Sequence, residues 1–497
     1  MPVQHTTHAI VGNTLAAMVA ALELAKQGKK VVLINPTDAK NVALGGHFSG
    51  ITSHGELFDI GLVSLEFSSF SQQAGWQDLP SYNPSLRNDV GRFFNVAHDW
   101  LSTFIGTHVI STPQMLVGGQ WFDDVLSANA FHTFRQLPFA NSMRDEMVLF
   151  SANAQLHAIK KTSAKIYNTL DYATASIANH GYIFHHKLIA PYLKKVLGIS
   201  PNEMLARYHR IAWLPMYWPE TLKKTLKGER IRLSSSQFSY PNKSSVAALI
   251  KKIADLIKKN SNITIVQSGI ACIKAMPINT QQNGWQIILN NAMPVACEHL
   301  AWSNSPASLL LALNEKPQPV IEKKAALALL FLQIPSDTLC HSASVMNVVD
   351  SHYSIYRVTN QSACADNQAS FAQRPMTQLI AEFNCDYFNQ CYQANVTLTD
   401  DQIARYLIKE LIEMGIIKTA DCKIAAEIKR LPNGFLIPDL AAKTACEKDI
   451  AKLEKFYPNI TRMGMSSGFF VTSFNDQILQ GLQFAATQKH AELQTHA

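Results

Sequence analysis

The fold is decided by the stretch His8-Ala-Ile-Val-Gly12, by the Ala-, Leu- and Met-rich run from Thr14 to Gln27 and, after Gly28, by Lys30-Val-Val-Leu-Ile-Asn35. The two short apolar stretches predict buried strands, and the run between them predicts a helix that ends at Gly28. Strand, tight turn, helix and strand within about 30 residues indicate a βαβ unit in a parallel sheet.

The turn after the first strand is where such a unit can hold a phosphate, because free backbone N–H groups and the positive end of the helix meet there. Against the dinucleotide pattern G-x-G-x-x-G, Gly12 supplies the first position, Thr14 stands at the second and Ala17 at the third. At the end of the second strand, where an acid would hold ribose hydroxyls, the sequence has Asn35. This stretch alone leaves open both a nucleotide site and a purely structural βαβ unit.

The composition narrows the class of protein. The chain has 497 residues, of which 47% are hydrophobic and 16% charged, with a formal net charge of +7. This length predicts two or three domains, and the composition excludes a disordered, fibrous or small stapled protein. The basic excess is too small for a nucleic-acid partner, so we expect a small-molecule substrate. Lysine clusters such as Lys251-Lys252 are compatible with a peripheral contact to an anionic membrane. The sequence does not predict an oligomeric state.

The cysteines and the N-terminal stretch suggest where the protein works. The chain has 8 cysteines, none of them in C-x-x-C spacing, which favours scattered thiols over disulfides, a zinc site or a redox pair. The apolar stretch Ala9–Ala25 has no Lys or Arg before it and contains Glu23, so we expect neither a signal peptide nor a membrane span. We therefore expect a soluble, cytoplasmic protein.

Two further glycine patterns extend the argument along the chain. Leu44-Gly45-Gly46-His47 follows the second strand by about ten residues, and Phe58-Asp59-Ile-Gly61 comes next. Near the C-terminus, a turn at Gly464 precedes Ser473-Phe-Asn-Asp-Gln-Ile-Leu-Gln-Gly481. Ser473 or Asn475 is expected to cap a helix there, with Asp476 in its first turn, where a negative charge suits the helix dipole.

Together these patterns resemble the flavoprotein superfamily that includes monoamine oxidases, phytoene desaturases, protoporphyrinogen oxidase and UDP-galactopyranose mutase. The resemblance implies that FAD is the cofactor, with the glycine pair near its pyrophosphate, the main chain at Ile270 near its adenine and the C-terminal helix near its flavin ring. That family usually has Arg after the glycine pair, where this chain has His47. The predicted cofactor-binding residues are Gly12, Thr14, Ala17, Asn35, Gly45, Gly46, His47, Ile270, Gly464, Ser473, Asn475, Asp476 and Gln477.

The resemblance also implies an architecture. It predicts an α/β fold, α+β overall, in which a Rossmann-like FAD domain made of residues 1–75, 240–310 and 430–497 is interleaved with a mixed substrate domain made of residues 76–239 and 311–429. In the substrate domain, Tyr356-Arg357 loosely resembles a strand that carries an arginine near the flavin in mutase-like members. A structural ion pair is the other interpretation of Arg357.

Three functions follow as hypotheses. The main one is an FAD-dependent oxidoreductase in which an apolar small-molecule substrate gives hydride to flavin N5. The second is a flavin-dependent mutase or isomerase without net oxidation. The third is a degenerate member that binds FAD weakly or not at all and serves as a binding or scaffold protein. The departures from the family pattern that favour this third hypothesis are Thr14, Asn35, His47 and Met465.

Overall fold

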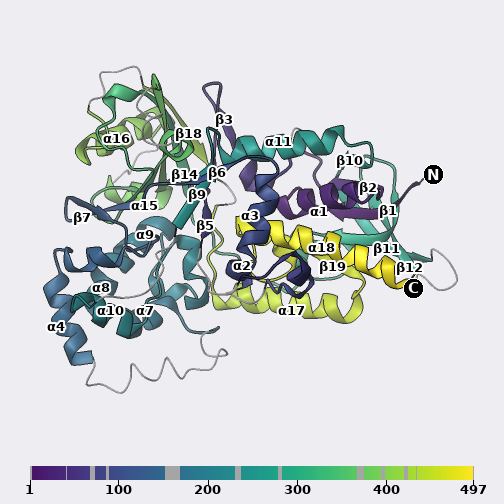
Figure 1. The fold of residues 1–497 in the computed structure, drawn as a ribbon, viewed down its shortest axis with the longest axis horizontal. Helices are drawn as coiled ribbons and strands as arrows, with labels where there is room; N and C mark the ends of the chain where they lie inside the picture. Colours follow the sequence, from purple (N-terminus) through teal and green to yellow (C-terminus); the bar gives the residue numbers. More distant parts are fainter. Residues whose placement is uncertain are drawn as a thin grey trace.

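A computed structural model shows two parts side by side, each built around a large mixed sheet (Figure 1). The structure describes residues 3–40, 42–67, 73–84, 89–150, 168–229, 237–277, 283–366, 374–392, 398–418, 424–431 and 434–495. The α/β fold class predicted from the sequence is confirmed.

The first sheet contains the βαβ unit. Its strands lie in the order β10 (Ile263–Gln267), β2 (Val31–Asn35), β1 (Gln4–Val11), β13 (Val295–Trp302), β12 (Asn283–Leu289) and β11 (Ile270–Pro277), with β19 (Ile460–Arg462) also paired to β13. The strand β1 is parallel to both of its neighbours, so that His8 lies opposite Val31 on one side and His299 on the other. The strand begins at Gln4, earlier than predicted at His8, because polar residues 4–6 pair with residues 295–297.

Helices cover both faces of this sheet. One face is covered by α1 (Leu15–Lys26), α3 (Phe94–Ser102), α11 (Val246–Lys259) and α18 (Phe474–Thr495), and the other by α12 (Pro306–Ala312) and α17 (Leu440–Phe456). Consecutive residues of β1 point to opposite faces: Ile10 packs with α1, α11 and α18, and Val11 packs with α12 and α17. Because both faces of the sheet are buried, residues 9–11 of β1 and 31–34 of β2 are all apolar and do not alternate with polar residues.

The second sheet forms the core of the other part. Its order is β18 (Ala425–Arg430), β14 (Leu327–Pro335), β17 (Met376–Asn384), β16 (Ile355–Asn360), β15 (Val345–Val348), β7 (Gln114–Val117) and β8 (Gln120–Asp123). One face packs on α15 (Cys385–Cys391) and α16 (Asp400–Glu413). The other packs on α4 (Ala140–Phe150), α7 (Tyr172–His180), α8 (Tyr182–Phe184), α9 (Ala190–Leu197) and α10 (Pro219–Leu226).

The chain passes between the two parts several times. A small sheet joins β5 (Leu65–Phe67), β9 (Gln237–Pro241) and β6 (Thr107–Val109), and β3 (Ile51–Ser53) forms a hairpin with β4 (Glu56–Phe58). Short helices α2 (Asp89–Arg92) and α13 (Gln361–Ala365) lie between longer elements. The first sheet thus takes strands from three distant segments, although the predicted domain boundaries stay a prediction. Among the helices of the described ranges, none has the length and apolar character needed to cross a membrane.

The helices α1 and α18, from opposite ends of the chain, cross at Gly481. A Cβ atom at this position would lie 2.6 Å from Val19 Cβ and 2.7 Å from the Ala16 carbonyl oxygen. The glycine therefore allows the two helix backbones to approach closely, which explains in physical terms why the C-terminal pattern ends in this residue.

We predict that Gly481→Ala destabilises the protein by about 1–3 kcal/mol, because the added methyl group overpacks the crossing. Helix propensity alone predicts the opposite sign, a gain of about 1 kcal/mol. The free energy of unfolding in denaturant measures the difference. As a control, Thr487→Ala on the same helix is expected to change stability by less than about 0.5 kcal/mol, and a stabilised Gly481→Ala variant would refute the close crossing.

Candidate functional site

The N-terminus of α1 offers the sheet's clearest place for an anion. Thr14 caps the helix, because its Oγ1 accepts from Ala17 N–H at 3.3 Å, and Gln477 Oε1 accepts from Ala16 N–H at 3.4 Å. Within the described ranges no group accepts from the N–H of Thr14 or Leu15. Two main-chain donors are therefore left for a ligand at the positive end of a 12-residue helix.

The predicted glycine pair lies against this turn. Gly45 N–H donates to the Asn13 carbonyl at 2.6 Å, which places the loop beside α1. Gly46 has a φ of +57°, and a Cβ atom there would meet nothing within 4 Å. An open space therefore borders Gly46, in a conformation that favours glycine.

The side chain of His47 stands at the same edge. Its ring is exposed and lies 3.8 Å, centroid to centroid, from that of Phe48. Desolvation by the groups around the ring lowers the pKa of His47 below its usual value. The imidazole is therefore neutral at pH 7, and it can offer a phosphate a hydrogen bond without a positive charge.

The C-terminal pattern joins this edge from the far end of the chain. Phe474, the first residue of α18, packs edge to face on Phe48 with ring centroids 4.9 Å apart. Ser473 is the predicted cap: its Oγ accepts from Asp476 N–H at 3.2 Å. The Asp476 carboxylate accepts from the Tyr82 hydroxyl, and burial raises the pKa of Asp476. Asn475, the other cap candidate, lies inside the helix and is buried.

Two of the other predicted positions have protein partners. Gly464 N–H donates to Gln480 Oε1 at 2.7 Å, and Met465 beside it is 46% exposed. Asn35 is buried at the end of β2, where its Nδ2 donates to the Val42 carbonyl at 3.1 Å. The amide predicted to meet a ribose therefore holds the loop that follows β2.

Sequence reasoning missed Asp38, three residues further on. Its carboxylate accepts from Gly269 N–H and from the side-chain amides of Asn290 and Asn291, each at 2.8 Å. The hydrogen bond from Gly269 is the main cause that lowers the pKa of Asp38. The network fixes the start of β11, where Ile270 pairs with Leu289. A single acid in a polar loop gave no signal for these contacts, since all three partners are more than 200 residues away.

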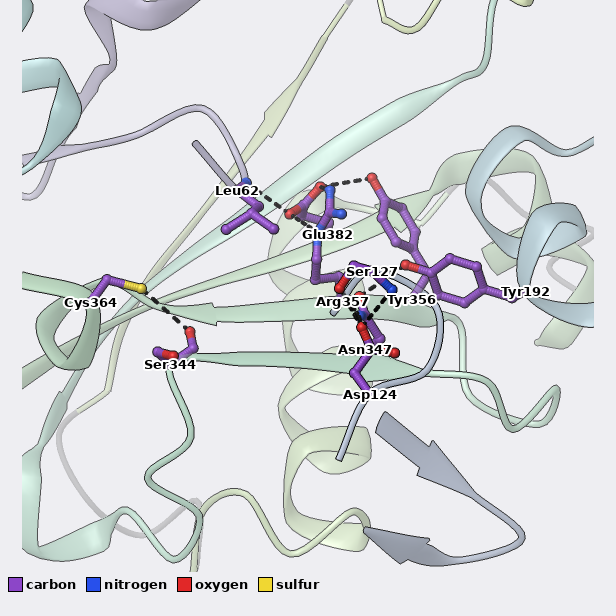
Figure 2. Close-up of polar contacts among 10 residues, drawn as sticks. All are labelled: Leu62, Asp124, Ser127, Tyr192, Ser344, Asn347, Tyr356, Arg357, Cys364 and Glu382. Atoms are coloured by element: carbon purple, nitrogen blue, oxygen red, sulfur yellow. Dashed lines mark hydrogen bonds and ion pairs between the residues drawn. The ribbon is translucent and has the colours of Figure 1, made fainter. Parts of the chain in front are cut away.

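Tyr356 and Arg357 lie in the interior of the second part (Figure 2). Arg357 Nε and Nη2 donate to the two carboxylate oxygens of Glu382 at 2.6 and 2.7 Å, and Tyr356 Oη donates to the same group at 2.9 Å. Leu62 N–H, from the loop after β4, donates to Glu382 at 3.1 Å. The structure thus places Arg357 in an ion pair that also holds a loop of the first part, and this partner was not predicted.

A second buried network lies next to this ion pair (Figure 2). Asp124 accepts from the N–H groups of Leu126 and Ser127 at 2.8 Å and from Asn347 Nδ2 at 3.0 Å. Tyr192 Oη donates to Asn347 Oδ1 at 3.0 Å. Burial raises the pKa of Asp124. These residues tie β15, α9 and the loop after β8 together.

We predict that Glu382→Gln destabilises the protein by about 3–5 kcal/mol, since it leaves the Arg357 guanidinium buried without a counter-charge. Denaturant unfolding measures the loss. The matched control is Glu413→Gln, which removes an exposed partner of Lys409 on α16 and is expected to cost less than about 1 kcal/mol. Equal losses in the two variants would contradict the account of Arg357.

The Asp59 of the Phe58-Asp59-Ile-Gly61 pattern binds the N-terminus of a helix, whose own cap is Ser245. Its carboxylate accepts from Ala247 N–H at 2.7 Å, in the first turn of α11, and from the Tyr240 hydroxyl. Its own N–H donates to Gln361 Oε1 at 2.7 Å. Burial raises the pKa of Asp59 from 3.8 to about 6. The pattern thus joins the β4 loop to α11 and α13.

This raised pKa predicts a pH dependence of stability. The folded state keeps the Asp59 proton up to a higher pH than the unfolded chain does. The folded protein is therefore most stable, as far as Asp59 is concerned, below pH 3.8, and its free energy of unfolding falls as the pH rises from 3.8 to about 6. The stability of the wild type relative to Asp59→Asn should therefore fall by about 2–3 kcal/mol between pH 4 and 6.5. Denaturant unfolding across this range measures it. Asp255→Asn, on the exposed face of α11, should keep the wild-type profile, and a flat difference curve for Asp59→Asn would refute the shift.

Comparison with known proteins supports the fold and leaves the family open. No protein-family model matches the chain, and no curated protein matches it. Solved structures do: a reduced UDP-galactopyranose mutase has a TM-score of 0.67 at 15% identity, covering 98% of this chain and 94% of that one. A protein described as a putative protoporphyrinogen oxidase from Exiguobacterium sp. 255-15 has a TM-score of 0.62 at 13% identity, covering 99% and 100%. Cyclohexylamine oxidase from Brevibacterium oxydans IH-35A has a TM-score of 0.57 at 14% identity, covering 98% of this chain and 99% of that one.

These similarities confirm the fold that the sequence resemblance predicted, over nearly the whole length of the chain. At such identities they define an architecture: a dinucleotide-type sheet and a second mixed sheet, built by one chain that passes between them. They do not assign a reaction.

Proposed function

We propose that this chain binds FAD at the carboxyl edge of the first sheet and acts as an FAD-dependent oxidoreductase on a small apolar substrate. The observation that carries the proposal is the convergence of three segments at this edge: the turn before α1, the glycine pair at Gly45-Gly46 and the start of α18. Ligands of open α/β sheets bind at this edge. The solved structures of the same fold include a cyclohexylamine oxidase and a reduced UDP-galactopyranose mutase.

The residues present suit the pyrophosphate of such a cofactor. The N–H groups of Thr14 and Leu15 would hold its oxygens, and the open space at Gly46 would let the backbone pass close to them. His47, neutral at pH 7, would add a hydrogen bond. Bound FAD would supply a two-electron acceptor.

The N-terminus of α18 would lie next to the flavin ring of the cofactor. The first N–H groups of this helix and its dipole favour negative charge, which is the charge that a reduced flavin carries. Nearby, Phe469 and Phe470 pack on Tyr208 of the other part, with ring centroids 5.1 and 5.6 Å from the Tyr208 ring. These half-buried rings would exclude water and present an apolar wall to a substrate.

A degenerate, weakly binding protein is the second candidate, and Asn35 favours it. Its Nδ2 donates to the Val42 carbonyl, and an amide in place of an acid lacks the charge that strengthens a hydrogen bond from ribose. An absorbance spectrum of the purified protein separates the two functions. Flavin bands near one FAD per chain support the oxidoreductase, whereas a colourless protein that takes up no added FAD refutes it. For a yellow protein, photoreduction without air followed by oxygen distinguishes an oxidase from a mutase.

We predict that Gly46→Val abolishes FAD binding while the fold survives, because its side chain would fill the open space beside the backbone. A valine at a φ of +57° carries some backbone strain, about 1–2 kcal/mol. The matched control is Gly55→Val in the β3–β4 turn, which has a φ of +81° and equally open surroundings. Flavin fluorescence titration and circular dichroism measure binding and fold. Retained binding in Gly46→Val, or equal loss in Gly55→Val, would contradict the assignment.

A further inference from the structure

A cavity lies beside β19, the strand that pairs with β13 in the first sheet, and close to the start of α18. It has a volume of about 580 Å³, within the usual range for small-molecule sites. Its walls come from the segment before α2, from the end of β19, from the turn after it and from α18. The lining residues are Ser81, Tyr82, Asn83, Pro84, Pro458, Ile460, Thr461, Arg462, Ser467 and Gln483.

The chemistry of this lining favours a hydroxylated anion. Arg462 is the one charged residue among these ten described residues, which include no acid. Serine and threonine hydroxyls and two side-chain amides make up most of the remaining polar groups. Ser81 and Ser467 already donate to main-chain carbonyls, as does Gln483 Nε2, so these groups can accept from the hydroxyl groups of a ligand through their oxygens.

Within the part of the chain that the structure describes, the guanidinium of Arg462 uses two of its N–H groups. Its Nη1 donates to the Ile450 carbonyl at 3.1 Å, and its Nη2 pairs with Glu454 at 2.7 Å. These are two of the five N–H groups of the side chain. Glu454 is 59% exposed, so this ion pair contributes little, and an anion in the cavity can compete with it.

Two residues of α18 hold the wall of the cavity, one in its first turn and one in its third. Gln483 Nε2 donates to the carbonyls of Pro80 and Tyr82, at 3.1 and 2.8 Å. The hydroxyl of Tyr82 donates to the carboxylate of Asp476. A ligand that binds residues 81–84 therefore also contacts, through Tyr82, the segment that holds the start of α18.

We propose that this cavity is a regulatory site for a small hydroxylated anion of about the size of a sugar phosphate. Arg462 binds its anionic group, and Thr461 and the neighbouring polar side chains bind its hydroxyls. Occupation of the site stabilises the first turn of α18 through Tyr82. The effect on a flavin at that helix rests on the function proposed above, but the site itself does not.

Binding is tested by calorimetric titration of the protein, with no FAD added, using ribose 5-phosphate, ribose and inorganic phosphate as probes. We expect ribose 5-phosphate to bind with a dissociation constant below about 1 mM and at least tenfold more tightly than either other probe. Arg462→Gln should weaken it at least tenfold and Thr461→Val at least threefold. Arg430→Gln, which breaks an exposed ion pair with Asp400 in the other part, should bind as the wild type does.

No binding of ribose 5-phosphate at 5 mM, or unchanged binding in Arg462→Gln, would overturn the site. Phosphate binding as tightly as ribose 5-phosphate would overturn the recognition of hydroxyls. Hydrogen exchange tests the coupling: ribose 5-phosphate should slow the amides of residues 474–482 at least threefold in the wild type and not in Tyr82→Phe. Unchanged exchange in the wild type would overturn the regulatory role. Because no arm uses FAD, failure here is distinct from a failure to bind flavin.

Discussion

The close contact between α1 and α18 is the constraint on which the rest of the first part depends. The helix α18 can lie against α1 only because Gly481 has no side chain. Once it lies there, Gln477 reaches Ala16 and Phe474 reaches Phe48. One crossing of two helices thus sets the positions of three segments that are far apart in sequence, and the candidate site consists of those segments.

Much of this arrangement could be predicted from local sequence. The βαβ unit has strong signals, since its apolar runs are unbroken and glycines mark both turns. Its observed limits differ from the predicted ones by a few residues at most, and the cap at Ser473 is observed as predicted. These features depend on residues that are close together in the sequence, so residue type and spacing are enough to predict them.

The partners of charged groups could not be predicted in the same way. Arg357 was recognised as a candidate, but Glu382 was not, because the two residues meet only through the pairing of β16 with β17. Asp38 likewise meets its three partners through the sheet. Each of these contacts forms only in the tertiary structure, and the residue type alone does not distinguish a buried carboxylate from a solvated one. All of the cofactor-binding assignments, those at Asn35 and Ile270 included, stay predictions.

The position of β1 has a consequence for how the protein is made. This strand lies inside its sheet, between β2 and β13, and β19 is added beyond β13. During synthesis, β1 and α1 therefore leave the ribosome long before β19 and α18. Until α18 has been made, the apolar surface of α1 that it covers has no partner from this helix, and such transiently exposed surface is prone to aggregate.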